Sequence, residues 1–239
     1  MNKIVIDSNK DIIIDSNGDY DISFANGNDI KLVISVSDEI SAKVFIHSNS
    51  INISGKINYS LGYNSKLIIN RFSFNDICNL EENIYLNGKY SSIKYNFSCI
   101  SNDVNNYKMR VFHNNSNVSS YISNKCIGND GSEIVFDIDS ILNKGNVSCV
   151  MDQTSKIMCF GDVKAKISPN MYIDEEDVTA RHGSVIGRFS DEEIFYVMSR
   201  GVDYKSTISL LIKGFILSNL ELDDERIKEI IDIIDNNCK

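Results

Sequence analysis

The sequence predicts a mainly β fold followed by a small C-terminal α-helical domain. Short runs rich in Ile, Val, Phe and Tyr recur roughly every 8 to 12 residues through the first part of the chain, and helical periodicity begins only after residue 188. Composition changes near Pro169. Residues 1–170 hold 26 of the 29 asparagines and 18 acidic against 16 basic side chains, whereas the remaining 69 residues hold 15 acidic and 8 basic. We therefore predict two domains, residues 1–188 and residues 189–239.

The first domain reads as a series of β-strands joined by polar turns. Many of the runs are flanked by Asn, Asp, Gly or Ser, which accept left-handed turn conformations. Their spacing fits either a β-sandwich or a β-solenoid. The solenoid is favoured, because no Cys…Trp…Cys signature of an immunoglobulin-like sandwich is present and because asparagines at successive turns can form side-chain ladders between stacked coils. The predicted strands are Lys3–Ile6, Asp11–Asp15, Tyr20–Phe24, Lys31–Val36, Lys43–His47, Lys66–Asn70, Ser92–Cys99, Lys108–His113, Glu133–Ile138, Val147–Met151 and Lys156–Phe160.

Three helices are predicted in the second domain. Ser190 and Glu193 form a capping box, in which each side chain can bond the other residue's backbone amide, and Gly201 follows the basic last turn as a typical helix stop. Further helices begin near Asp203 and Asp223. Each of these two places isoleucines and other apolar residues on one face. The faces comprise Ile208, Leu211, Ile212, Phe215 and Ile216 in the second helix, and Ile227, Ile230, Ile231 and Ile234 in the third.

The charge and the hydropathy pattern exclude several classes of protein. The 239 residues carry a formal net charge of −9 with a pI near 4.8, and they contain no dense run of Lys and Arg. We therefore expect neither nucleic acid nor an anionic membrane as a partner. Charged residues interrupt every apolar run, so no signal peptide and no membrane-spanning helix is predicted. These features indicate a cytoplasmic protein.

Common catalytic and nucleotide-binding motifs are absent. The chain has no Gly-x-x-x-x-Gly-Lys-Ser/Thr, no Gly-x-Ser-x-Gly and no His-Glu-x-x-His, so a P-loop ATPase and the commonest serine-hydrolase and zinc-protease sites are excluded. Six cysteines occur without any Cys-x-x-Cys, which argues against a zinc ribbon. In a reducing cytosol we expect most of them to be small buried apolar residues.

Three histidines determine which chemistry is available near neutral pH. His47 and His113 each end an apolar run and are predicted to be surface or turn residues. His182 differs, because it lies in a polar, glycine-containing segment between the β-region and the helices, where a loop can aim a side chain outward. The nearby acidic run 174–177 is favoured as a solvated turn over a cation site, since hard cations need ligands that converge from several directions.

A specific order and spacing of residues marks the segment from Ser168 to Phe215, about a fifth of the chain. Its elements are Pro169, Asp177, Val178, His182, Gly183, Gly187, Phe195, Tyr196, Ser199, Arg200, Gly201 and Phe215. In this arrangement the segment resembles the C-terminal signature of the SufB/SufD family of iron–sulfur cluster assembly proteins. The resemblance implies a right-handed parallel β-helix core and a helical C-terminal domain. It also implies a non-enzymatic scaffold that binds no nucleotide itself.

The resemblance further implies the partners and the site. Family members pair through their β-helix ends, here with a SufB-like partner or a second copy, and dock their C-terminal helices on a SufC-like ABC-type ATPase. His182 falls on the family's interface histidine, considered a ligand for the transient iron–sulfur cluster or iron, and a neutral imidazole suits iron. SufD-like members often carry a cysteine where this chain has Ala180, and SufB-like members carry a cysteine and a glutamate where it has Val163 and Gly183. The chain therefore resembles SufD more than SufB.

Other candidate residues have two interpretations each. Cys159 is either a substitute thiol near the cluster or a core residue of a β-run. The residues Phe195, Tyr196, Arg200, Gly201 and Phe215 either dock the ATPase and support the docking helices or pack internally. Two other functions stay open: a carbohydrate-active β-helix enzyme, which requires a groove lined by carboxylates, and a plain binding solenoid.

Overall fold

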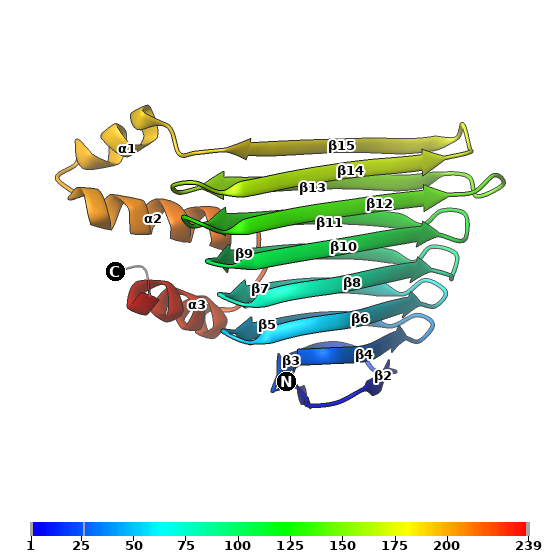
Figure 1. The fold of residues 1–239 in the computed structure, drawn as a ribbon. Coiled ribbons are helices and arrows are strands. Elements are labelled where there is room, and N and C mark those ends of the chain that lie inside the picture. Colours follow the sequence, from blue (N-terminus) through cyan, green and yellow to red (C-terminus); the bar gives the residue numbers. More distant parts are fainter. Residues whose placement is uncertain (1, 26, 238–239) are drawn as a thin grey trace.

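Residues 2–25 and 27–237 are described by a computed structural model, in which a stack of strands is followed by helices (Figure 1). The helices are α1 (Asp191–Met198), α2 (Tyr204–Leu217) and α3 (Asp224–Asn237). None of them is long and apolar enough to span a bilayer. The strands are β1 (Asn2–Ile6), β2 (Lys10–Ile14), β3 (Gly18–Phe24), β4 (Gly27–Val36), β5 (Ser41–Asn49), β6 (Asn52–Leu61), β7 (Lys66–Phe74), β8 (Ile77–Leu86), β9 (Ser92–Ser101), β10 (Val104–His113), β11 (Ser119–Gly128), β12 (Glu133–Leu142), β13 (Cys149–Cys159), β14 (Lys164–Ile173) and β15 (Val178–Gly187).

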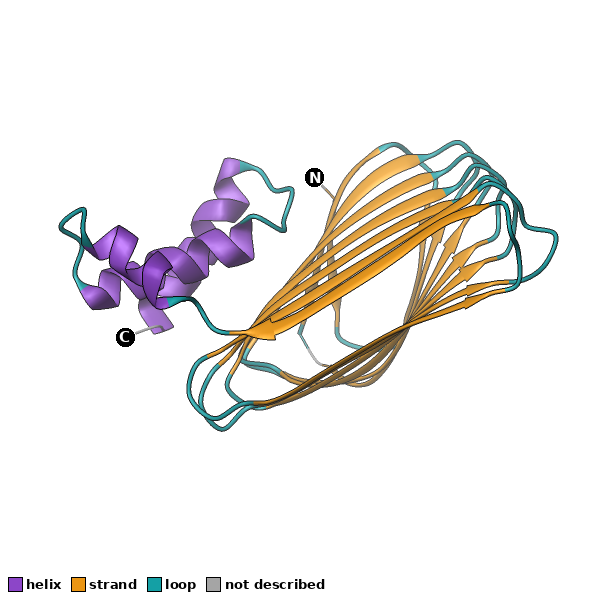
Figure 2. Cartoon of the chain, turned by 90° about the horizontal axis from the view of Figure 1, so that it is seen from above, coloured by secondary structure: helices purple, strands orange, loops and turns teal. Residues whose placement is uncertain are grey.

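The strands alternate between two parallel sheets. Sheet A contains the odd-numbered strands in the order β1 to β15, and sheet B contains the even-numbered strands in the order β2 to β14. Each strand pairs in parallel with the strand two positions along the chain, and the two sheets face each other across the core (Figure 2). An antiparallel sandwich also has two sheets that face each other, but its strands do not pair in parallel with the strand two positions along the chain. The predicted β-solenoid is therefore confirmed.

The core lies between the two sheets. Along β12, for example, Ile134, Phe136 and Ile138 are buried, and the residues between them are partly exposed. Because neighbouring strands are in register, buried positions of successive coils form continuous rows of Ile, Leu, Val, Phe and Tyr. Removing each such side chain from water contributes about 1.5–3 kcal/mol.

Asparagine ladders connect the coils at the turns, as predicted. Asn114 donates to Asn87 at 2.8 Å, and Asn129 donates to Asn102 at 2.5 Å. Asn64 and Asn117 adopt left-handed backbone angles, with φ of 48° and 58°, at turns of the stack. Asparagine tolerates this conformation better than most residues do, so the same residue type shapes the turn and bonds its neighbour.

The turn before β9 packs so closely on the preceding coil that it requires glycine. A Cβ atom added to Gly88 would lie 2.0 Å from the carbonyl carbon of Gly62. We expect Gly88→Ala to lower the free energy of unfolding by about 1–3 kcal/mol, because the backbone of one coil must move. Gly214→Ala is the control, since nothing lies within 4 Å of its added Cβ in α2, and alanine is expected to stabilise that helix by up to about 1 kcal/mol. Equal effects in urea unfolding would contradict the steric explanation.

The helices begin as predicted. Ser190 and Glu193 form both hydrogen bonds of the capping box, and Asp203 caps α2 by accepting from the amide of Ser206. The first helix ends sooner than predicted, at Met198, so Arg200 lies beyond it and the expected basic last turn is absent. Gly201 has a φ of +87°, a conformation that favours glycine.

A second apolar cluster joins α2 and α3 to the outer face of sheet A. Its buried members from the sheet come from the C-terminal parts of β5, β7, β9 and β11, and those from the helices lie on the predicted apolar faces. They are Phe45, Phe72, Phe74, Ile100, Ile127, Ile212, Ile216, Ile230 and Ile234. This cluster explains why both faces of β7 are buried near its end.

A buried ion pair ties α3 to the first coils. The guanidinium of Arg226 contacts the carboxylate of Asp21 on β3 and lies 5.3 Å from the ring centre of Phe45. His47 contacts the other oxygen of Asp21 at 3.1 Å. Burial lowers the pKa of His47, against the raising effect of Glu229. Segments 205 residues apart in sequence thus meet on one side of sheet A.

The structure corrects several predictions. Strands β6, β8, β11, β14 and β15 were not predicted, because many of their positions hold polar residues or glycine. His113 ends β10 but is buried rather than at the surface, since its ring faces the core and contacts the hydroxyl of Ser120 at 2.9 Å and the carbonyl of Ile141 at 3.3 Å. The segment containing His182 is a strand, not a loop. The cysteine prediction is confirmed for Cys78, Cys99, Cys126 and Cys149, and Cys238 lies outside the described residues.

Candidate functional site

The solenoid has an uncovered end at its last coil. β15 is the final strand of sheet A and pairs only with β13, while β14 is the final strand of sheet B and pairs only with β12. In the part of the chain that the structure describes, no strand pairs with the outer edges of β14 and β15. Unpaired backbone groups on a strand edge are a ready template for another chain.

His182 lies in the row of β15 that faces the inside of the solenoid. It is in register with Gln153 on β13, a buried core position, and in-register parallel neighbours point the same way. The same row of β15 contains Ala180 and Ser184, opposite the buried Met151 and Ser155. All three β15 residues are nevertheless exposed, because no further coil covers them. The fold therefore presents His182 on the end face of the solenoid.

Apolar side chains share the end face with His182. From β14, Ile167 and Met171 pack partly against the main core, and Pro169 lies between them. From β15, Ile186 is 49% exposed. Sequence reasoning missed these residues as a group, although the alternation of Ile167, Pro169, Met171 and Ile173 is the period-2 signal of a strand. The end face is thus a partly apolar surface with an imidazole on it.

The imidazole of His182 is free to bind a ligand. Among the described residues it forms no hydrogen bond and no ion pair, and its side chain is exposed. Neutral imidazole offers one nitrogen lone pair, which suits iron and other transition metals. No group of three or more His, Cys, Asp or Glu residues in 2–25 and 27–237 is placed to hold a metal. The described residues therefore do not by themselves form a complete set of metal ligands around His182.

The structure separates Cys159 from His182. Cys159 is the last residue of β13, six positions beyond the residue that pairs with His182, which corresponds to about 20 Å along the strand. Its side chain is half-buried against the main core. Burial raises the pKa of the Cys159 thiol, and Arg188 partly opposes this. Within a single chain, the two candidate ligands are not brought together.

The candidate docking residues of α1 lie in one exposed region. No residue of α1 is buried, and Phe195 and Tyr196 are 74% and 62% exposed. Arg200 lies over the ring of Tyr196, with its Cζ atom 5.1 Å from the ring centre, and donates to its hydroxyl at 3.1 Å. Gly201 ends the same turn. Figure 1 shows α1 beyond the end of β15, away from both sheets.

Phe215 occupies a different environment. It packs in the second apolar cluster, with its ring 6.1 Å from that of Phe189, and Lys125 lies 5.1 Å from its ring centre. The contacts that its aromatic ring makes are therefore within the chain, in line with the internal-packing interpretation. The structure groups Phe195, Tyr196 and Arg200 but not Phe215.

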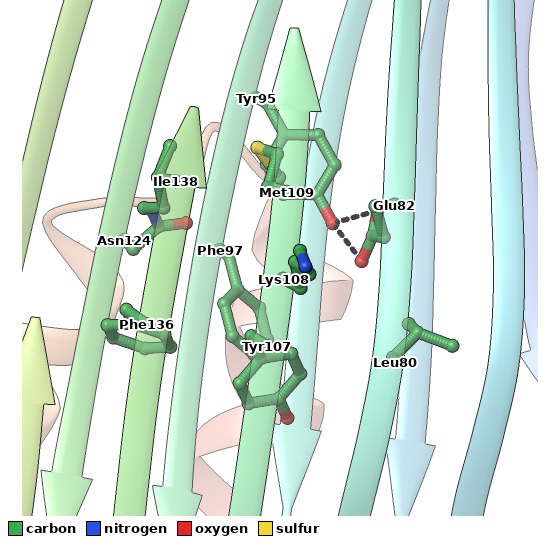
Figure 3. Close-up of a pocket in the computed structure, with 10 residues that line it drawn as sticks. All are labelled: Leu80, Glu82, Tyr95, Phe97, Tyr107, Lys108, Met109, Asn124, Phe136 and Ile138. Atoms are coloured by element: carbon green, nitrogen blue, oxygen red, sulfur yellow. Dashed lines mark hydrogen bonds between the residues drawn. The ribbon is translucent and has the colours of Figure 1, made fainter. Parts of the chain in front are cut away.

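One pocket between the two sheets is too small for a substrate. Figure 3 shows this pocket, whose lining includes Phe97, Tyr107, Phe136 and Glu82, and in which Glu82 accepts hydrogen bonds from Tyr95. The cavity measures about 10 Å³, close to the least that holds one water molecule. This pocket is part of the packed core.

A shallow groove on the outer face of sheet A is larger, at about 420 Å³, but its chemistry is not that of a glycosidase. Its lining includes Lys94, Tyr121 and Asp152. Glycoside hydrolysis needs two carboxylates that flank the bond. Asp152 is the one carboxylate among the described lining residues, and Arg181 pairs with it at 2.7 Å. This groove therefore lacks the pair of flanking carboxylates that a glycosidase requires.

Comparisons with known proteins give independent evidence. Residues 35–215 match the family model described as the SUF system FeS cluster assembly, SufBD core domain. The chain is 24% identical over 161 residues to the iron–sulfur cluster assembly protein SufD of Bacillus subtilis, covering 66% of this chain and 37% of that protein. It is 28% identical over 150 residues to SufD of Escherichia coli, covering 60% of this chain and 35% of that protein.

A shorter stretch is more similar to another relative. It is 41% identical over 54 residues to an iron–sulfur cluster assembly SufBD family protein of Mycobacterium leprae, covering 22% of this chain and 14% of that protein. The chain spans little more than a third of the length of the two SufD proteins. The family model nonetheless includes most of the solenoid, the strand that carries His182 and helix α1. The chain belongs to the SufBD family of iron–sulfur cluster assembly proteins.

Proposed function

We propose that this chain is a SufD-like scaffold subunit that builds an iron–sulfur cluster at the uncovered end of its solenoid. It is not an enzyme and binds no nucleotide itself. The cluster, or iron on its way to a cluster, is its transient cargo. The observation that carries the proposal is the exposed, unpartnered imidazole of His182 on a face that ends a packed core.

A partner that pairs with β14 and β15 would complete the site. Such a partner, either a SufB-like chain or a second copy, satisfies the free strand edges and covers Met171 and Ile186 by strand addition. It also supplies ligands that the described residues of this chain do not place near His182. If the partner is a second copy, a twofold interface brings two copies of His182 to the same junction.

A second partner, an ABC-type ATPase, docks on α1. Two aromatic side chains that are more than half exposed on one short helix favour a protein contact, since aromatic residues are enriched at the energetically important centres of interfaces. Arg200 stiffens Tyr196 by lying over its ring. Closure of the ATPase pair would pull on the helical domain and rearrange the covered end. The complex works in the cytoplasm.

Separate variants of the end face and of α1 test the two proposed surfaces in cells that depend on this protein. His182→Ala is expected to lower the activity of iron–sulfur enzymes at least 10-fold while the ATPase still co-purifies with the tagged chain, because α1 is unchanged. Ser184→Ala is the control, since Ser184 is exposed in the same row of β15. The double variant Phe195→Ser/Tyr196→Ser is expected to lose the ATPase.

Two outcomes would contradict the proposal. Unchanged enzyme activity in His182→Ala removes His182 from cluster assembly. Absence of any ATPase from the wild-type preparation removes the docking assignment of α1. Folding is checked by the urea midpoint, which should stay the same in all three variants because every replaced side chain is exposed.

A further inference from the structure

Gln153 is a buried amide that is only half satisfied. Its side chain is 1% exposed, and its Nε2 atom donates to the hydroxyl of Ser140 at 2.6 Å and to the carbonyl of Asn170 at 3.4 Å. A backbone carbonyl can only accept, so these contacts fix which end of the amide is the NH₂ group. The Oε1 atom is buried and has no hydrogen-bond partner among the described residues.

The position of Gln153 in the stack leaves one donor for this oxygen within its row. On one side its neighbour is Ile122 of β11, which is apolar, and on the other side it is His182 of β15. Adjacent strands are about 4.8 Å apart, so the imidazole lies within side-chain reach of the amide. His182 is exposed and unbonded and can therefore rotate.

We propose that Gln153 is a positioning residue that accepts a hydrogen bond from one ring N–H of His182 and so fixes the tautomer of the imidazole. The opposite ring nitrogen then keeps its lone pair and points away from the core, toward the end face. Metal-binding histidines commonly donate their second nitrogen to a carbonyl or carboxylate in this way. The inference rests on the proposed function, in which His182 is the ligand, and adds Gln153 as the residue that orients it.

Nitrogen-15 NMR of the full chain labelled at histidine tests the hydrogen bond directly. At pH 8.5 an ordinary imidazole is neutral, and its two ring nitrogens report which one carries the proton. The chain has three histidines, and His182 is assigned by the signals lost in His182→Ala. We expect one tautomer of His182 in the wild type and a mixture in Gln153→Met. A mixture in the wild type overturns the inference even if the variant fails to fold.

The matched control is Ser155→Ala. Ser155 is also buried on β13 and faces inward, but it is in register with Ser184 and bonds Asn124 instead. It should leave the tautomer of His182 unchanged, and a mixture there would indicate general loosening of the end coil, contrary to the inference. In cells, Gln153→Met is expected to lower iron–sulfur enzyme activity about 10–100-fold.

The spectra separate this inference from the proposed function. A fixed tautomer that becomes mixed in Gln153→Met, together with a harmless His182→Ala, would keep the hydrogen bond but reject the role in cluster assembly. A tautomer that Gln153→Met does not affect, together with a damaging His182→Ala, would reject Gln153 and keep the role of His182.

Discussion

Glu82→Gln is expected to lower the free energy of unfolding by about 3–5 kcal/mol, because it leaves a charged guanidinium without its counter-ion in the solenoid core. Glu82 on β8 and Arg71 on β7 face each other between the two sheets, and the side chain of Arg71 is 0% exposed. The glutamine has nearly the same shape, so packing changes little. The loss is therefore electrostatic.

The surroundings of the pair make this charge difficult to replace. Tyr59 donates to Glu82 at 3.0 Å. Tyr95 donates to it at 2.7 Å, as Figure 3 shows. Burial, followed by the charge of Glu82, raises the pKa values of Tyr59 and Tyr95 well above the ordinary value, so both hydroxyls stay protonated and donate. The Nε and Nη2 atoms of Arg71 have no partner among the described residues, so its charge depends heavily on Glu82.

Glu81→Gln is the matched control for this variant. Glu81 precedes Glu82 in β8 and points to the outer face of sheet B, where it pairs with Lys56 at 3.0 Å and with Arg110 at 3.1 Å. Ion pairs exposed to solvent contribute about 0–1 kcal/mol, so the same chemical change should have a small effect. Urea unfolding at neutral pH measures both variants. A loss of similar size in both would show that the buried pair has no special weight.

His113 is expected to make the protein less stable as the pH falls from about 6.5 to 4. Burial lowers the pKa of His113 to about 4, against the raising effect of hydrogen bonds to the backbone at Ile141 and Val111. In the unfolded chain a histidine has a pKa of about 6.5, so between these values the unfolded state binds more protons than the folded state. Stability therefore rises with pH in this window, and its loss approaches about 3 kcal/mol by pH 4.

The variant His113→Gln removes this titration and should flatten the pH dependence. Urea unfolding of the wild type and the variant from pH 7.5 to pH 4 gives the difference of the two curves, in which the titration of the many shared carboxylates largely cancels. If His113→Gln shows the same dependence of the free energy of unfolding on pH as the wild type, His113 is protonated in the folded protein and the prediction is wrong.

Much of this fold could be predicted because it depends on local patterns. The apolar alternation of Glu133–Ile138 and the capping box at Ser190 and Glu193 are encoded within a few residues, and both are confirmed. The asparagine ladders also follow from sequence, since turns recur with the period of the coil. Strands β6 and β11 were missed because their inward rows are not wholly apolar: Gly55 interrupts the row of β6, and Ser120 and Asn124 lie in the row of β11.

The site could be predicted only in part. Resemblance identified His182, but the residues around it suggested a loop, because β15 lies at the end of the stack and has no apolar row that must be buried on either face. His113 was wrongly predicted, since the partners that satisfy a buried imidazole come from other strands. Residues that pair between coils are 18 to 31 positions apart, as Gln153 and His182 are, and such pairs cannot be predicted from the sequence of a single chain.

The contact between Asp21 and Arg226 also sets an order of events during synthesis. A ribosome adds about 5–20 residues per second, so the guanidinium emerges roughly 10–40 s after the carboxylate, which it follows by 205 residues. Throughout that interval the first coils present a carboxylate and the ring of Phe45 without the helix that covers them. The earliest part of the stack is thus among the last to be completed, and nascent chains depend on their own later residues to cover it.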